Sequence, residues 1–116
     1  ARPLGRPAIE RISLPTADGI FFVSPQEIIR AEASGNYATV YFTDSKKLLL
    51  AKTLKDIEDI LQGHSFIRIH QSHLVNIDHI SKYSKSDGGI VFMKDGSKLP
   101  VSRQRKEELT KLFAGG

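Results

Sequence analysis

Residues 37–43 read YATVYFT, and this stretch decides the fold class. Its odd positions carry Tyr or Thr, and its even positions carry the apolar residues Ala38, Val40 and Phe42. Successive side chains of a β-strand point to opposite faces, so the alternation predicts a strand with one buried face. Turn-prone residues flank it at 34–36 and 43–46, and the segments beyond, 28–33 and 47–51, are its expected antiparallel neighbours.

Further short strands are predicted outward from this centre, separated by turns rich in Gly, Asp, Ser and Pro. They are expected at 9–15, 20–23, 66–70, 74–76, 80–84, 90–93 and 98–101, with one turn at 87–89. Thr53 and Asp56 predict the first turn of an internal helix that ends at Gly63, and Ser102 predicts the start of a short C-terminal helix. About ten short antiparallel strands and two helices indicate a mainly β protein, an all-β sandwich.

Length and composition indicate one folded domain. The chain has 116 residues, 40% of them hydrophobic, and no cysteine. The absence of cysteine excludes disulfide frameworks, Cys-ligated metals and thiol nucleophiles, and it suits a reducing cytoplasm. The longest apolar runs, such as 20–23, are far shorter than the roughly 20 residues of a membrane span. Residues 1–10 lack the apolar core of a signal peptide, and we interpret them as the remnant of a linker.

Charge is distributed unevenly along the chain. The net charge is +4, and residues 94–106 carry five basic side chains against a single acidic one. These cations are Lys94, Lys98, Arg103, Arg105 and Lys106. Such clusters are typical of surfaces that contact phosphates, although many are simply solvated.

The sequence offers no constellation of residues for catalysis, a metal or a nucleotide cofactor. His70, His73 and Asp78 could be drawn as a metal site, but residues three apart on an extended segment point to opposite faces. Ser72 lies beside two histidines without the glycine-flanked turn that exposes a nucleophilic serine. No glycine-rich phosphate loop is present. We therefore expect neither an enzyme nor a bound cofactor or metal.

Three polar segments suit contact with a nucleic acid duplex. At 34–37, Asn36 and Tyr37 offer hydrogen-bond donors and acceptors, although an ordinary hairpin with a left-handed Asn36 is the favoured explanation when this turn is taken by itself. The second segment, 68–73, is too polar for a core. In it Gln71 can bind adenine in bidentate fashion, while His70 and Ser72 can hold phosphate oxygens.

The third segment, 102–106, opens the C-terminal helix. Arg103 can donate two hydrogen bonds to guanine, and Arg105 and Lys106 can bind phosphates. Cations at the start of a helix oppose its dipole, so without an anionic partner they are mildly unfavourable. This conflict favours a site for an anion.

The same three segments carry a resemblance to the LytTR-type DNA-binding domain of bacterial response regulators. It extends from about Ile20 to Phe113 and is strongest in EASGNY at 32–37, TLKDIEDIL at 53–61, FIRIHQSHLVN at 66–76 and DGSKLPVSR at 95–103. The resemblance implies an elongated fold of three small antiparallel sheets. It also implies that loops, rather than a recognition helix, enter successive major grooves of bent DNA.

By position, the resemblance implies base contacts from Tyr37, with Asn36 beside it, from Gln71 and from Arg103, and a backbone contact from Lys106. Many family members carry a basic residue in place of Gln71 and an aromatic residue in place of His73, so the target bases here are expected to differ.

The resemblance implies the cytoplasmic output domain, at 11–113, of a two-component transcriptional regulator in a phosphorelay, with 114–116 as a tail. It would bind direct-repeat promoter sites as a dimer, downstream of a receiver domain. The alternative is a β-rich protein-interaction module, which would need an exposed apolar patch that the sequence does not locate.

Overall fold

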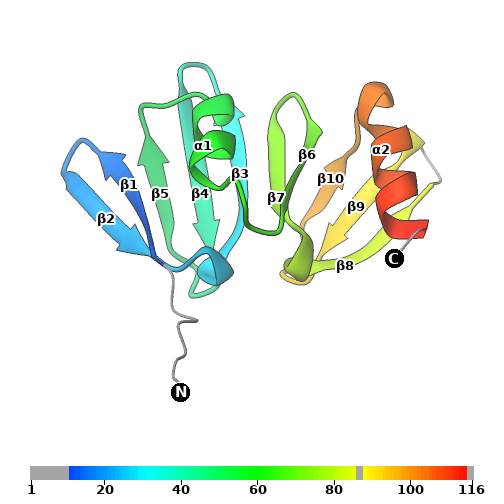
Figure 1. Cartoon of the computed structure of the whole chain (residues 1–116), viewed down its shortest axis with the longest axis horizontal. Helices are drawn as coiled ribbons and strands as arrows, with labels where there is room; N and C mark the ends of the chain where they lie inside the picture. Colours follow the sequence, from blue (N-terminus) through cyan, green and yellow to red (C-terminus); the bar gives the residue numbers. More distant parts are fainter. Residues whose placement is uncertain (1–10, 86–87, 115–116) are drawn as a thin grey trace.

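The computed structural model describes residues 11–85 and 88–114. The expected linker at 1–10, Asp87 of the turn at 87–89 and the last two residues of the expected tail lie outside these ranges. Ten antiparallel strands in the described residues form three sheets, accompanied by one internal and one C-terminal helix (Figure 1). The predicted mainly β fold is confirmed.

The largest sheet contains five strands in the order β5-β4-β3-β7-β6. Its strands are β3 (Ile28–Ser34), β4 (Tyr37–Phe42), β5 (Lys47–Leu50), β6 (Phe66–His70) and β7 (His73–Asn76). Ala38, Val40 and Phe42 are buried on β4, as the alternation predicted. The helix α1 (Leu54–Ile60) connects β5 to β6 and lies against this sheet (Figure 1).

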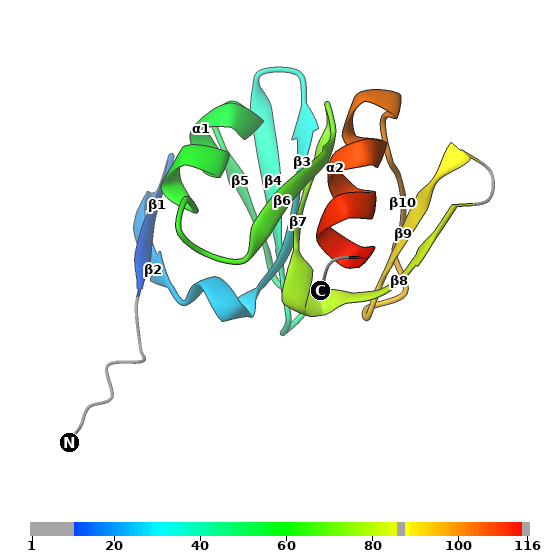
Figure 2. The same cartoon turned by 45° about the vertical axis from the view of Figure 1, so that its right-hand side comes forward.

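The other two sheets are smaller. β1 (Ile12–Thr16) and β2 (Gly19–Val23) form a two-stranded hairpin at one side of the five-stranded sheet. β8 (Ile80–Ser84), β9 (Ile90–Met93) and β10 (Lys98–Pro100) form a three-stranded sheet at the other side, covered by α2 (Arg103–Ala114), as Figure 2 shows. Short 3-10 helices, η1 (Pro25–Glu27) and η2 (Ile77–His79), occupy two of the predicted breaks between strands.

Two hydrophobic cores lie on opposite faces of the five-stranded sheet. Ile28 and Leu74 belong to the core beneath α1, whereas their neighbours Ile29 and Val75 belong to the core beneath α2. Adjacent residues of a strand point to opposite faces, so a strand covered on both faces carries consecutive apolar residues. This is why β3 and β7 lack the clean alternation of β4.

A capping box begins α1. The Thr53 side chain accepts a hydrogen bond from the Asp56 amide at 3.2 Å, and the Asp56 carboxylate accepts one from the Thr53 amide at 3.2 Å. These bonds satisfy amides that the first helical turn leaves without partners. Leu54 and Ile57 are buried against the sheet, so the predicted internal helix is confirmed.

Candidate nucleic-acid interface

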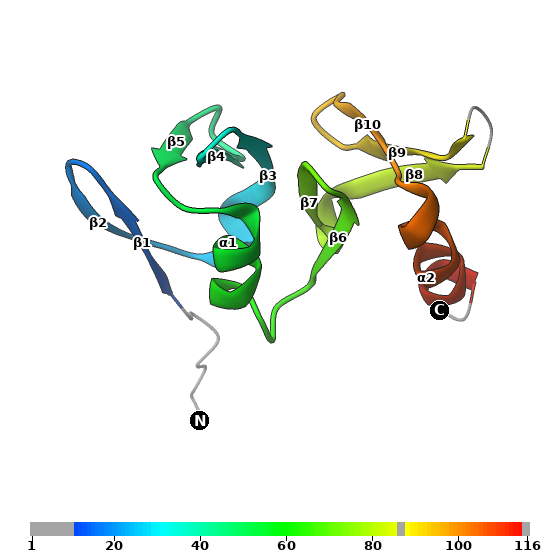
Figure 3. The same ribbon diagram turned by 90° about the horizontal axis from the view of Figure 1, so that it is seen from above.

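The three polar segments lie along one edge of the molecule, at the top of Figure 1 and facing the viewer in Figure 3. We call this the loop edge; it consists of the β3–β4 turn at 35–36, the β6–β7 turn at 71–72 and the β10–α2 connection at 101–102. Main-chain hydrogen bonds connect the β6–β7 turn to the end of β3 and to the β10–α2 connection: the Ala33 amide of β3 donates to the Ser72 carbonyl at 2.9 Å, and the Ser102 amide donates to the Ile69 carbonyl at 2.8 Å. The β6–β7 turn is thus tied to both neighbours.

The central turn uses every carbonyl from 69 to 72. The β6–β7 register shifts by one residue between Arg68 and His70, and such a bulge releases main-chain groups from the ladder. The Arg68 guanidinium donates to the His70 carbonyl at 2.9 Å and to the Gln71 carbonyl at 2.6 Å. With the two main-chain bonds to Ser72 and Ile69, these contacts define the shape of the turn.

The sequence predicts that His70 and His73 point to opposite faces of one extended segment, and the structure differs. The turn at 71–72 makes them cross-strand partners, and their ring centroids are 5.4 Å apart. The argument that they point to opposite faces was therefore wrong. The described residues nevertheless hold no group of three or more His, Asp or Glu side chains arranged for a metal ion.

His70 accepts a hydrogen bond within the turn, and His73 is partly buried beside it. His70 Nδ1 accepts a hydrogen bond from the Ser72 amide at 3.0 Å, which assigns the ring proton of the neutral form to Nε2. Burial lowers the pKa of His73 below its usual range, an effect that the Glu32 carboxylate on the adjacent strand opposes. Burial within the sheet therefore favours the neutral form of His73.

In the first segment, the left-handed position of the turn belongs to Gly35, with φ of 62°, and not to Asn36. The interpretation of Asn36 as a left-handed turn residue was wrong, because the residue without a Cβ takes that conformation at no steric cost. Asn36 is exposed, and Tyr37 is 50% exposed although it begins a strand. Both side chains are open to a ligand.

In the third segment, α2 begins at Arg103, directly after the predicted capping residue Ser102. Arg103 is exposed, whereas Arg105 pairs with Glu108 at 3.7 Å. The Lys106 side chain lies over Gly89, where an added Cβ would stand 3.1 Å from Lys106 Cε. The helix start therefore presents Arg103 freely, while the next two cations are partly engaged.

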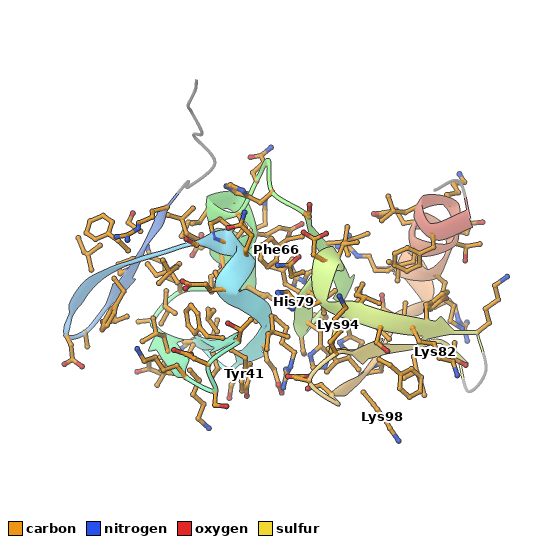
Figure 4. All side chains as sticks on the ribbon, turned by 90° about the horizontal axis from the view of Figure 1, so that it is seen from below. Tyr41, Phe66, His79, Lys82, Lys94 and Lys98 are labelled. Atoms are coloured by element: carbon orange, nitrogen blue, oxygen red, sulfur yellow. The ribbon has the colours of Figure 1, made fainter. Side chains whose placement is uncertain are left out.

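The basic window at 94–106 does not form one cluster. Figure 4, viewed from the side opposite to the loop edge, shows Lys94 in the β9–β10 turn and Lys98 on β10. Lys98 Nζ lies 5.8 Å from the centre of the Phe92 ring on the neighbouring strand. Of these five cations only Arg103, Arg105 and Lys106, at the start of α2, lie near the loop edge, so counting charges along the sequence overstated the local charge.

Comparison with known proteins identifies the family. The LytTr DNA-binding domain family matches residues 18–114, which is most of the chain. The chain belongs to the LytTR family of DNA-binding domains. This is a non-enzymatic family.

Individual relatives support this membership. The sensory transduction protein LytT of Bacillus subtilis is 34% identical over 106 residues, covering 89% of this chain and 43% of that protein. A heme-containing CO-sensing transcriptional regulator, RcoM 2 of Paraburkholderia xenovorans, is 27% identical over 81% of this chain and 36% of its own length. This LytTR domain thus spans less than half the length of the curated relatives it matches.

A solved structure has the same fold. It is the LytTr DNA-binding domain of a putative methyl-accepting/DNA response regulator from Bacillus cereus, with a TM-score of 0.75 and 27% identity. The match covers 89% of this chain and 95% of the solved chain. Neither helix in the described part of this LytTR domain is long and apolar enough to cross a membrane.

The LytTR domain also has an exposed apolar surface that the sequence did not locate. On β2, Ile20 is 62% and Phe22 64% exposed, and Phe21 is 41% exposed. A groove of about 480 Å³ lies between β2 and the β4–β5 turn, lined by Phe21, Phe22, Val23, Phe42 and Leu48, with Glu27, Thr43, Asp44 and Lys46. The β4–β5 turn is at the opposite end of β4 from the loop edge, so the two surfaces are separate.

The residue whose role the sequence did not predict is Arg68. Arg68 lies inside the polar segment at 68–73. The neighbouring residues do not show whether its side chain binds main-chain carbonyls or faces a ligand. Its third contact, an ion pair with Glu58 of α1 at 3.1 Å, joins residues ten positions apart. The only sequence feature that could have indicated this role was the arginine itself, within the string FIRIHQS.

Proposed function

We propose that this chain is the sequence-specific, double-stranded DNA-binding output domain of a bacterial transcriptional response regulator. The observation that carries the proposal is the loop edge, where three polar segments are held together by main-chain hydrogen bonds. Rigid placement of side chains is what base recognition in a groove requires. Membership of the LytTR family supports the same conclusion.

The exposed side chains of the loop edge divide by chemistry into base and phosphate contacts. Asn36, Tyr37, Gln71 and Arg103 are exposed, and we assign them to base edges in successive major grooves. The more buried members are assigned to phosphates, since such contacts orient a protein on the duplex. These are His70, Ser72, Arg105 and Lys106.

For the whole protein, we propose a cytoplasmic two-component regulator with a phosphorylated receiver domain upstream. The relatives named LytT are sensory transduction proteins of more than twice this length, which supports a further domain. Residues 1–10 would be the linker, 11–113 the domain and 114–116 a tail. Two copies would occupy direct repeats of a promoter as a dimer on DNA.

Selection of random-sequence duplexes by the purified chain at about 0.15 M salt tests this function, because non-specific contacts weaken as salt rises. We expect an enriched motif repeated at a spacing of about 10 base pairs, one turn of the duplex. Bulk retention that depends on salt and enriches no motif would contradict sequence-specific recognition.

A second candidate function, a protein-interaction module, is favoured by the exposed apolar side chains of β2. We assign this surface to the receiver domain of the full-length protein. Copies on direct repeats are related by translation, so the same patch of two copies would not meet. The groove also lies away from the loop edge, which leaves DNA binding free.

Phe22→Ser should separate the two surfaces. Phe22 is 64% exposed, so we expect the free energy of unfolding to change by less than about 0.5 kcal/mol. DNA affinity measured by fluorescence anisotropy should stay within about twofold, since no charge or loop-edge residue changes. A large loss of specific DNA binding in this variant would contradict the assignment of DNA binding to the loop edge.

A further inference from the structure

We propose that Arg68 is a positioning residue that determines sequence preference by shaping the β6–β7 turn, and that Glu58 links this turn to α1. The inference rests on the proposed DNA-binding function. Arg68 itself is assigned no contact with DNA, because its side chain is only 14% exposed and its guanidinium is already engaged at both nitrogen ends and at Nε.

The first step is the geometry of the guanidinium. Nε and one terminal nitrogen donate to two successive carbonyls, those of His70 and Gln71, and the other terminal nitrogen donates to the Glu58 carboxylate. Only a planar group with several fixed donors can satisfy three acceptors in this arrangement. A lysine would keep the charge and lose the geometry.

The carbonyls of His70 and Gln71, which Arg68 binds, control the direction of the Gln71 side chain. They belong to the two peptide units on either side of the Gln71 Cα atom, so their orientation decides where the Gln71 side chain projects from the turn. Gln71 is exposed and has no hydrogen bond from its own side chain among the bonds described for this turn. Its direction therefore depends on the backbone, which Arg68 orients.

The third step is the connection to α1. Glu58 lies on the helix that packs on β3 and β7, and its pairing with Arg68 adds a link between that helix and the turn. Asp59, the next residue of α1, pairs instead with Lys55 at 3.3 Å on the exposed side of the helix. Glu58→Gln and Asp59→Asn remove equal charge, but only the first breaks the link to Arg68.

The test compares Arg68→Lys, Glu58→Gln and the control Asp59→Asn in the selection of random duplexes and in anisotropy titrations. For Arg68→Lys we expect specific binding to fall at least about tenfold and random-duplex binding to stay within about twofold, because the charge is kept. The lost preference should lie at the base pair whose selection also disappears in Gln71→Ala, and the preference that depends on Arg103 should remain.

A readout without DNA keeps the two proposals distinguishable. Amide hydrogen exchange measured by NMR should become at least about tenfold faster at Ser72 and Ala33 in Arg68→Lys, since their bonds depend on the shape of the turn. Asp59→Asn should leave both amides unchanged. If the unmodified chain selects no motif, the DNA-binding proposal fails, and with it the effect on sequence preference, while the exchange rates still decide whether Arg68 shapes the turn.

Three results would overturn the inference. Equal loss of specific and random binding in Arg68→Lys would make Arg68 a direct phosphate contact. Unchanged sequence preference together with unchanged exchange would show that the turn does not need it. Glu58→Gln covers the case in which Arg68→Lys does not fold: we expect a loss of about three- to tenfold in specific binding, and behaviour identical to Asp59→Asn would remove Glu58 from the proposal.

Discussion

Arg103→Ala is expected to weaken binding to the selected DNA site by about 1–3 kcal/mol, or roughly 5- to 150-fold, and to relax preference at one base pair. Arg103 is the exposed cation at the start of α2, whereas its neighbour Arg105 pairs with Glu108. A bidentate contact with guanine is the strongest recognition that one side chain provides in the major groove. Binding to random duplexes should fall by less than about threefold.

Lys106→Ala is the matched control, since it removes one positive charge from the same helix. It should weaken binding to all sequences alike and lower the slope of log affinity against log salt by about one. Titrations of both variants over a range of salt, on the selected site and on random DNA, separate the two roles. If both substitutions lowered specific and random binding by one common factor, the division between base and phosphate contacts would be wrong.

Local signals in the sequence predicted much of the fold. The alternation along 37–42 and the capping pair of Thr53 and Asp56 act within a few residues, and both gave the element that the structure contains. The consecutive apolar pairs of β3 and β7 carry no alternation, because two cores cover both faces of those strands. The division into three sheets was implied by the family resemblance and not by periodicity.

The turn at 71–72 shows why local reasoning stopped short of the site. Its residues, Gln71 and Ser72, lack the glycine or asparagine that marks a two-residue hairpin. The structure supports this turn through the Arg68 side chain and through amides of Ala33 and Ser102, which are distant in sequence. The exposed candidates could be named from residue types, but their joining into one edge depends on these non-local bonds.

The second large expected effect is a loss of stability when Asn76 is replaced. Asn76 is 2% exposed, and its side chain donates to the Ile28 carbonyl at 2.9 Å and accepts from the Asp78 amide at 2.9 Å. Asn76→Ala leaves both of these groups without their partner, so we expect the free energy of unfolding to fall by about 2–4 kcal/mol. In a domain of this size each kcal/mol lowers Tm by about 4–8 °C, which calorimetry resolves.

Asn36→Ala is expected to show the opposite pattern to Asn76→Ala, with a loss of specific DNA binding and little change in stability. Asn36 is exposed in the turn at 35–36, and its loss should change the free energy of unfolding by less than about 0.5 kcal/mol while weakening specific DNA binding. Asn76→Ala, measured well below its Tm, should bind the selected site with unchanged preference, because Asn76 holds the end of β7 to the start of β3, at the far end of these strands from the loop edge. A Tm within two or three degrees of the parent, roughly half a kcal/mol, would show that the two hydrogen bonds of the Asn76 side chain stabilise the fold far less than the burial of Asn76 implies.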